Sequence, residues 1–258
     1  MKITVLLENT ACRQAICEEH GLSLLVESEG KTLLFDMGQT DLFAKNAEQL
    51  GVDLSCVDLA VLSHGHYDHG GGLATFLAQN SHAPVYLHRD AFLPHYNGQE
   101  KYIGLDVSLR RHPRLRYTDG VTPIGEGMCL YSCNDRERAH HFGSFGLTEK
   151  VGDTFVADDF RHEQYLLVEE KGRRILLSGC SHKGVEDIVA WFTPDVLIGG
   201  FHFSKIQEEE RLLAAARHLD SFPTVYYTCH CTGEEQTAFL QKHMKRLYTL
   251  HGGQSLTV

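Results

Sequence analysis

The chain has 258 residues, which is enough for one large α/β domain or two small ones. Its composition, with 42% hydrophobic and 22% charged residues, is that of an ordinary globular protein and excludes a largely disordered chain. The formal net charge of −10 disfavours unselective binding to nucleic acids or to anionic membranes.

The sequence has no apolar run of the roughly 18–20 residues that a membrane-spanning helix needs. The first residues contain only a short apolar stretch, which predicts a first strand rather than a signal peptide. We therefore expect a cytoplasmic protein that does not act at a membrane and whose eight cysteines are reduced thiols. The cysteines lack the C-x2-C pairs of a structural zinc site.

The predicted elements of the first third alternate apolar strands with helices. Strands are expected over 3–7, 22–27 and 32–35, the last two joined by a turn at Glu29-Gly30. A helix over 40–50 follows, capped by Thr40, and then a fully apolar strand over 59–62. A run of glycines at 70–72 opens a helix over 73–77, and 85–87 form another strand.

The middle segment, about 97–160, is poorly periodic and rich in glycine, arginine and histidine. We expect loops and irregular strands there, as an insertion that covers one edge of a single domain spanning 1–258.

The last third resumes the earlier pattern. A hairpin is expected over 164–169 and 174–177, strands over 196–198, 225–228 and 247–250, and helices over 185–192, 207–219 and 234–243. The two ends look like copies of one plan, because each places a helix between two strands that are followed by polar residues. Two half-sheets facing each other with helices outside predict an α/β fold, a four-layer αββα sandwich, with a site where the strand ends converge.

The strongest local signal directly follows the predicted strand over 59–62. It is the run Ser63-His64-Gly65-His66-Tyr67-Asp68-His69-Gly70-Gly71-Gly72. Neutral imidazoles and carboxylates are ligands that zinc and similar divalent metals prefer. His64 and His66 are two residues apart on an extended turn and are expected to share one metal. Asp68 and His69 lie past the turn and are expected to reach a second.

This H-x-H-x-D-H run followed by glycines resembles the signature of the metallo-β-lactamase superfamily, which implies the αββα fold. Phe35-Asp36-Met37-Gly38 is similar to the F-D-x-G turn of that superfamily. The resemblance implies that Asp36 supports the metal-binding histidines without itself binding the metal. More narrowly, the segments EHGLSLLVE, LLFDMGQT, SHGHYDHGGGL, LSGCSHKG, IGGFHF and TCHCTG resemble one subfamily over nearly the whole chain. Its named member is the synthase of 7,8-dihydropterin-6-methyl-4-(β-D-ribofuranosyl)aminobenzene 5′-phosphate.

The chain departs from the superfamily pattern in one motif. That pattern has a third-motif histidine and a later aspartate that bridges two metals, but here the corresponding strand ends in Gly179-Cys180-Ser181-His182. Cys180 occupies the place of the bridging aspartate, where its thiolate is a candidate ligand. His182 is the candidate for the missing histidine ligand, with capping of the next helix as its alternative role. His230, after the strand over 225–228, matches the last metal-binding histidine.

Three further histidines have weaker signals. His202 follows a strand at the position equivalent to His64 in the duplicated plan, so we expect it in the active site, touching substrate rather than metal. His20 precedes a strand and is expected to line the substrate pocket. His162 lies near a possible third-motif position, but a structural role is favoured.

The implied metal is zinc, as one or two ions, with iron or manganese as alternatives. A bound divalent ion lowers the pKa of its water from about 15.7 toward about 7, which suits a hydrolase or a related transferase. Asp68 is expected to be catalytic as well as a ligand, because it would orient that water.

A basic segment bears on the substrate. Arg110, Arg111, Arg114 and Arg116 crowd one stretch of an otherwise acidic chain. Guanidinium groups suit phosphate or carboxylate, so Arg110 and Arg114 are candidates for binding a small anionic substrate, either phosphorylated or pterin-like. The alternative is a solvated loop that balances acidic neighbours.

Two other functions stay open. One is an iron-dependent redox enzyme of the same fold, although the diiron branch usually has glutamate where this chain has His66. The other is a non-catalytic metal-containing binder or sensor, which the absent bridging aspartate favours. A nuclease is disfavoured because the chain is acidic and lacks an appended nucleic-acid module.

Overall fold

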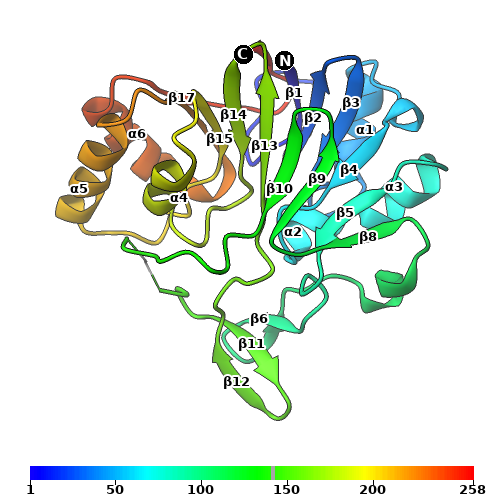
Figure 1. Cartoon of the computed structure of the whole chain (residues 1–258), viewed down its shortest axis with the longest axis horizontal. Helices are drawn as coiled ribbons and strands as arrows, with labels where there is room; N and C mark the ends of the chain where they lie inside the picture. Colours follow the sequence, from blue (N-terminus) through cyan, green and yellow to red (C-terminus); the bar gives the residue numbers. More distant parts are fainter. Residues whose placement is uncertain (141–142) are drawn as a thin grey trace.

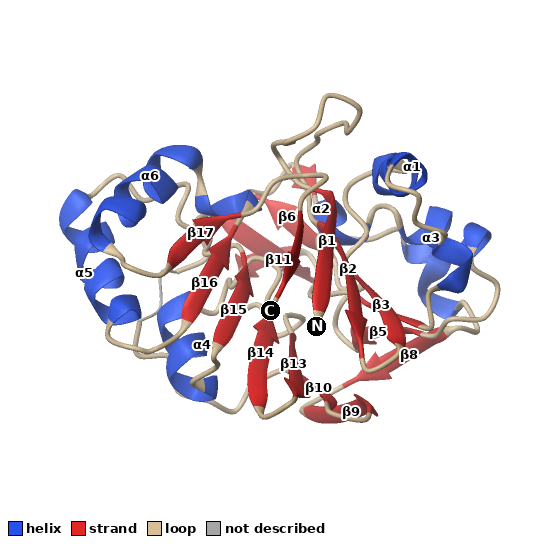
Figure 2. Cartoon of the chain, turned by 90° about the horizontal axis from the view of Figure 1, so that it is seen from above, coloured by secondary structure: helices blue, strands red, loops and turns tan. Residues whose placement is uncertain are grey.

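The computed structural model describes residues 1–140 and 143–258. Two large β-sheets lie face to face, with helices on the outer side of each (Figures 1 and 2). The four-layer αββα sandwich that the sequence predicts is therefore confirmed. Within the described ranges, no helix combines the length and the apolar character needed to cross a membrane.

The first sheet holds most of the N-terminal half. Its strands, in spatial order, are β18 (Ser255–Thr257), β1 (Lys2–Leu7), β2 (Ser23–Ser28), β3 (Lys31–Phe35), β4 (Leu59–Val61), β5 (Val85–His88) and β8 (Leu115–Thr118). Helices α1 (Leu42–Gln49) and α3 (Leu73–Gln79) cover its outer face. The short helix α2 (Tyr67–Gly70) and the 3-10 turns η1 (Leu54–Cys56) and η2 (Val107–Arg111) lie in the connections.

The second sheet holds most of the C-terminal half. Its strands, in spatial order, are β17 (Leu247–Thr249), β16 (Val225–Thr228), β15 (Val196–Gly199), β14 (Arg173–Leu177), β13 (Tyr165–Glu170), β10 (Met128–Tyr131) and β9 (Val121–Gly125). Its outer face is covered by α4 (Val185–Phe192), α5 (Glu209–Asp220) and α6 (Glu234–His243). The 3-10 turn η3 (His230–Thr232) follows β16.

The two halves follow the duplicated plan that the sequence indicates. In each, an antiparallel hairpin leads into parallel strands: β2 and β3 continue into β4, and β13 and β14 continue into β15. Helix α1 connects β3 to β4, and α4 connects β14 to β15.

The parallel strands are apolar on both faces because each sheet is covered on both sides. In β3, Leu33 and Phe35 point into the core between the sheets, while Leu34 points toward the helices. In β15, Val196 and Ile198 point inward and Leu197 points toward α4 and α5. Side chains of this kind contribute about 1.5–3 kcal/mol each when fully buried. This alternation explains why these strands are visible in the sequence as continuous apolar runs.

The expectation of loops and irregular strands over about 97–160 needs correction. Strand β8 extends the first sheet, and β9 and β10 complete the second. A third sheet, with the order β12 (Thr154–Ala157), β11 (Leu147–Val151), β6 (His95–Asn97), β7 (Lys101–Tyr102), lies beside the sandwich (Figure 1). Many side chains of β9 and β12 are exposed or half-buried, so their sequences lack the apolar alternation that marks a strand.

Helix α1 is tied to the first sheet by the buried side chain of Asn46. Its Nδ2 donates to the carbonyl oxygens of Leu6 and Cys17, each at 2.8 Å, and its Oδ1 accepts the Cys17 amide at 3.0 Å. We expect Asn46→Ala to lower the free energy of unfolding by about 2–3 kcal/mol, because these groups lose their partner away from water. Urea denaturation with a chelator present measures this. The control is Glu48→Ala on the exposed side of the same helix, and equal losses in both variants would contradict the assignment.

Candidate metal centre

The polar residues that follow the strands gather at one edge of the sandwich. Strand β3 leads to Asp36, β4 to His64, β14 to Cys180, β15 to His202 and β16 to His230. The donor atoms of six predicted residues fall into overlapping groups in which they lie within 4.8 Å of one another: His64, His66, His69, Cys180, His182 and His202. His230 shares a further group with Cys180 and Cys231.

Asp36 connects the two ends of the histidine-rich run. It is fully buried, with a φ of 60°. Its Oδ1 accepts the Ser63 amide at 2.7 Å, and its Oδ2 accepts the Ser63 hydroxyl and His69 Nδ1, both at 2.7 Å. An ionised carboxylate only accepts hydrogen bonds. Nδ1 of His69 therefore carries a proton, and the neutral ring has its lone pair on Nε2.

Nε2 of His69 faces Nε2 of His230 at 3.2 Å. His230 donates its Nδ1 to Oδ1 of Asn9 at 2.9 Å, and the Gly21 amide donates to the same oxygen at 3.2 Å. In the neutral rings both Nε2 atoms thus carry lone pairs, which repel at this distance unless a cation or a proton lies between them. The position between the two rings therefore suits a cation, either a proton or a metal ion that replaces it.

His64, His66 and His182 form a second group of donors. Ser63 gives its hydroxyl proton to Asp36, so its oxygen accepts His64 Nδ1 at 2.8 Å and leaves the His64 lone pair on Nε2. That Nε2 lies 3.4 Å from His182 Nε2. Burial lowers the pKa of all three histidines and favours the neutral form, which is the form that binds metals.

The spacings between donors fit metal coordination. Two nitrogen ligands about 2.0–2.1 Å from a tetrahedral zinc ion lie about 3.3–3.4 Å apart. The observed separations are 3.2 Å for His69 and His230 and 3.4 Å for His64 and His182. Sγ of Cys180 is 3.2 Å from His69 Nε2 and also groups with His64, so it lies between the two sets of donors. The side chains present therefore fit a divalent metal.

Asp68 links the metal-binding candidates to the pocket. Its Oδ2 is 3.2 Å from His230 Nε2 and 3.3 Å from Nε2 of the half-exposed His20. Burial alone would raise the pKa of Asp68, but the positive charge of His69 and the hydrogen bond from His20 hold it well below its usual range. The hydrogen bond to Asp68 in turn raises the pKa of His20.

Two buried glutamates that the sequence analysis missed hold the loops that carry the histidines. Glu8 accepts the His230 amide at 2.6 Å, and Glu163 accepts the His182 amide at 2.7 Å. Glu8 follows β1 and Glu163 precedes β13, so a position at a strand end was the signal available for both.

Gly179 allows the ends of β4 and β14 to meet. A Cβ atom at this position would lie 2.1 Å from Ser63 Oγ and 3.1 Å from His64 Nδ1. A side chain would therefore displace Ser63 from Asp36 and turn the His64 ring, so this close approach requires glycine.

A pocket of about 360 Å³ opens over these donors. His20 and His202 line it, as the sequence analysis expects. Among the described residues, neither ring nitrogen of His202 has a hydrogen-bond partner. Two lysines that were not anticipated also line the pocket. They are Lys101, the first residue of β7 in the third sheet, and Lys205.

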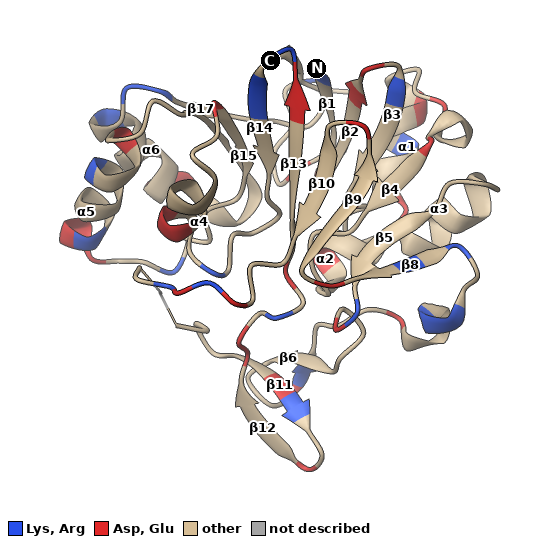
Figure 3. Ribbon diagram, viewed as in Figure 1, with Lys and Arg blue, Asp and Glu red and all other residues tan. Residues whose placement is uncertain are grey.

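The prediction that Arg110 and Arg114 bind the substrate is corrected, because neither lines this pocket. The Arg114 guanidinium instead donates to the carbonyl oxygens of Leu77 and Ala83 and to Oδ1 of Asn80, at the end of α3. Arg110 belongs to η2, which lies beside β8 and is blue in Figure 3. Arg114 therefore donates hydrogen bonds to carbonyl groups that the end of a helix leaves without partners.

His162 lies next to the metal-binding candidates, in the structural role that the sequence analysis favours. Its Nδ1 accepts the Gly65 amide at 2.9 Å, and its Nε2 is 3.3 Å from Asp158 Oδ2.

Metal binding is expected to release a proton from His69. Burial lowers the pKa of this ring, but the charges of Asp36 and Asp68 outweigh burial and raise the pKa to about 9. In the metal-free protein a proton thus occupies the position between His69 and His230 at neutral pH. Because proton and metal compete, the His69 proton should contribute about a tenfold rise in the metal association constant per pH unit from pH 7, and this contribution should level off above about 9.

Calorimetry of zinc binding in buffers of different ionisation enthalpy counts the released protons. A second proton is expected if Cys180 binds as a thiolate, and Cys180→Ser should remove only that one. Binding that is independent of pH between 7 and 9 would contradict the assignment of His69.

Comparison with known proteins agrees with this geometry. The family model described as the metallo-beta-lactamase superfamily matches residues 18–220. An uncharacterized protein of Methanocaldococcus jannaschii is 30% identical over 244 residues, covering 90% of each chain. From the same organism, 7,8-dihydropterin-6-methyl-4-(beta-D-ribofuranosyl)-aminobenzene-5′-phosphate synthase is 27% identical, covering 98% of this chain and 95% of its own.

Solved structures share the fold. Tm1679, a metal-dependent hydrolase of the beta-lactamase superfamily, superposes with a TM-score of 0.86 at 29% identity, covering 100% of this chain and 99% of its own. The Zn²⁺-bound PqqB of Methylobacterium extorquens has the same fold, with a TM-score of 0.60 at 13% identity and full coverage of both chains. With the matched model, the sandwich and the histidine-rich edge in agreement, the chain belongs to the metallo-β-lactamase superfamily.

Proposed function

We propose that the chain is a metal-dependent hydrolase, or a related transferase, that acts on a small anionic substrate. The observation that carries this proposal is the pair of facing imidazole nitrogens of His69 and His230, 3.2 Å apart beside the pocket. Membership of a superfamily that binds divalent metals supports it.

Two sets of side chains would hold the metal. His64, His66 and His182 form one, and Asp68, His69 and His230 form the other, with Cys180 between them. A divalent ion held there would acidify a water molecule and polarise an electrophile. Zinc suits these donors, and iron or manganese are alternatives.

The side chains around the donors would bind and orient the substrate and move protons. The ionised carboxylate of Asp68 lies 3.3 Å from Nε2 of His20. His20 is therefore positioned to exchange a proton with solvent. His202 lines the pocket, and its donor atom groups with those of Cys180 and His182, so the ring is positioned between the metal-binding candidates and the substrate.

Two lysines support an anionic substrate. Lys101 Nζ contacts the Tyr67 hydroxyl at 3.2 Å, and Lys205 Nζ contacts the Phe145 carbonyl oxygen at 2.9 Å. Both line the same pocket, whose volume suits a small molecule. The similarity to a synthase whose name specifies a 5′-phosphate supports a phosphorylated, pterin-like substrate.

Activity is expected to depend on the metal and on Asp68. Native protein purified without an affinity tag should contain one or two divalent ions by mass spectrometry. It should turn over at least one compound in a panel of phosphoesters and other hydrolysable anions, lose this activity to a chelator and regain it with zinc or manganese. Asp68→Asn should lower turnover by about 100-fold or more, because a ligand and a proton acceptor are lost together.

The outcomes separate the candidate functions. Turnover that survives complete metal removal would contradict the proposal. Tight substrate binding without product would instead favour a non-catalytic binder or sensor, for which Cys180 in place of a bridging carboxylate is the supporting observation. Iron in the native protein with a redox reaction would favour the iron-dependent alternative.

The two lysines are expected to determine affinity for the anionic part of the substrate. Lys101→Ala and Lys205→Ala should each raise KM for a phosphorylated substrate about tenfold or more, since hydrogen bonds to charged groups contribute about 1.5–3 kcal/mol. KM for an uncharged analogue should not change. The matched control is Arg110→Ala, which lies outside the pocket lining. Equal effects of all three substitutions would contradict the assignment.

A further inference from the structure

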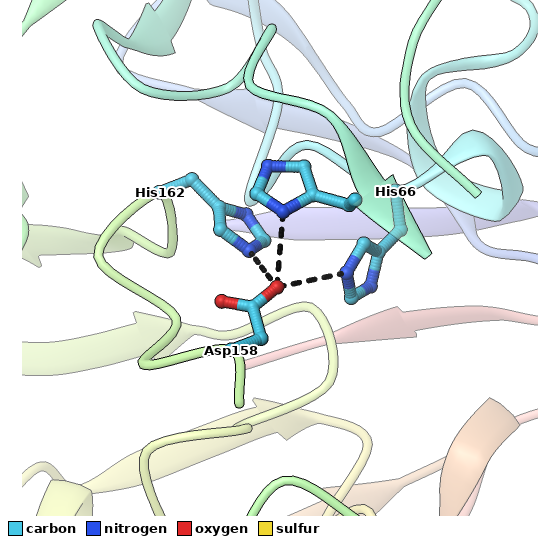
Figure 4. A group of neighbouring side chains, drawn as sticks. His66, Asp158 and His162 are labelled. Carbon is cyan, nitrogen blue, oxygen red and sulfur yellow. Dashed lines mark hydrogen bonds and ion pairs between the residues drawn. The ribbon is translucent and has the colours of Figure 1, made fainter. Parts of the chain in front are cut away.

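A buried carboxylate, Asp158, lies behind the ligand candidate His66. Its Oδ2 is 3.0 Å from His95 Nδ1, 3.3 Å from His162 Nε2 and 3.9 Å from His66 Nε2 (Figure 4). Its Oδ1 accepts the Phe160 amide at 2.7 Å, which fixes the orientation of the carboxylate. All four ionisable side chains are buried.

Three histidines and an aspartate at these distances have the composition of a metal site. The hydrogen bonds of His162 indicate a different role. Because the Gly65 amide donates to its Nδ1, the proton of the neutral His162 ring is on Nε2 and is donated to Asp158. His162 thus has no free lone pair for a metal. A histidine that binds a metal through Nε2 usually donates from Nδ1, which is the opposite arrangement.

His66 faces the same carboxylate through Nε2, which has no hydrogen-bond partner among the described residues. A carboxylate on one side of an imidazole attracts the ring proton to that side and leaves the lone pair on the other nitrogen. For His66 the other nitrogen is Nδ1, the atom that remains for the group with His64 and His182.

We propose that Asp158 is a positioning residue that orients His66 and fixes its tautomer for metal binding, with His95 and His162 holding the carboxylate in place. The proposal rests on the proposed function, because it assigns His66 to the metal. His162 adds a second connection, since it accepts the amide of Gly65, the residue between the two ligand candidates His64 and His66.

This network joins the third sheet to the metal centre. Asp158 directly follows β12, and His95 belongs to β6. The third sheet also supplies Lys101 and Leu147 to the pocket lining. One buried cluster therefore sets both the orientation of a metal ligand and the position of the sheet that borders the substrate.

The test is Asp158→Asn, with zinc affinity measured by competition against a chromophoric chelator and with cobalt absorption as a spectroscopic readout. A neutral amide holds imidazole N–H groups less strongly, so zinc affinity at one site should fall about 10–100-fold and the cobalt spectrum should change. Affinity at the site of His69 and His230 should stay the same. Both readouts are independent of catalytic activity.

Asp187→Asn is the matched control. Asp187 is also a buried carboxylate, and it accepts His140 Nδ1 at 2.9 Å and the His140 amide at 2.9 Å, outside the pocket lining. Its substitution should lower stability without changing zinc affinity or the cobalt spectrum. Asp158→Glu keeps the charge and should restore part of the affinity, which keeps the proposal testable if Asp158→Asn folds poorly.

The outcomes distinguish this inference from the proposed function. Wild-type protein that binds no metal would overturn both. Wild-type affinity and spectrum in Asp158→Asn would overturn the positioning role alone. A third ion in the wild type that disappears in His95→Gln would also overturn it, because the cluster would then be a metal site.

Discussion

The three hydrogen bonds accepted by the Asp36 carboxylate are the constraint on which the site depends. Asp36 stands at the end of β3, yet it fixes the start of the histidine-rich run through Ser63 and its end through His69. A buried carboxylate without partners is costly, so the run cannot leave this position without losing stability. The same bonds set the tautomers of His64 and His69. Fold stability and readiness to bind a metal therefore come from the same interactions.

The donors come from both halves of the chain. His64, His66 and His69 follow the first sheet, whereas Cys180, His182 and His230 follow the second. Their positions relative to one another are set by the packing of the two sheets across the inner core, and Gly179 permits the close approach of β14 to Ser63 and His64. Neither half alone can assemble the facing pairs of imidazole nitrogens. A metal that bound both groups would bind only the packed state and would stabilise it by mass action.

Much of this fold could be predicted from the sequence, and the reasons are physical. Strands such as β4 and β15 are buried on both faces, so they read as continuous apolar runs, and helix α4 was predicted with the bounds that the structure shows. Strands β9 and β12 are largely exposed and carry no such pattern. In the sequence, Arg114 looks like an anion-binding residue. No local pattern shows that a carbonyl group at the end of α3 needs a hydrogen-bond donor. Asn9 and Glu8 contact His230, which lies 221 and 222 residues further along the chain, and such pairings are not encoded in local spacing.

The third sheet has its own small apolar cluster, made of Ile103, Leu147 and Phe160, with Tyr67 packed against it. It contributes little to the three large cores of the sandwich. Residues of this sheet that line the pocket can therefore change without a loss of packing in the main domain. In evolutionary terms, the sandwich can be inherited intact while the third sheet diverges, provided that the contact between Asp158 and His66 is kept.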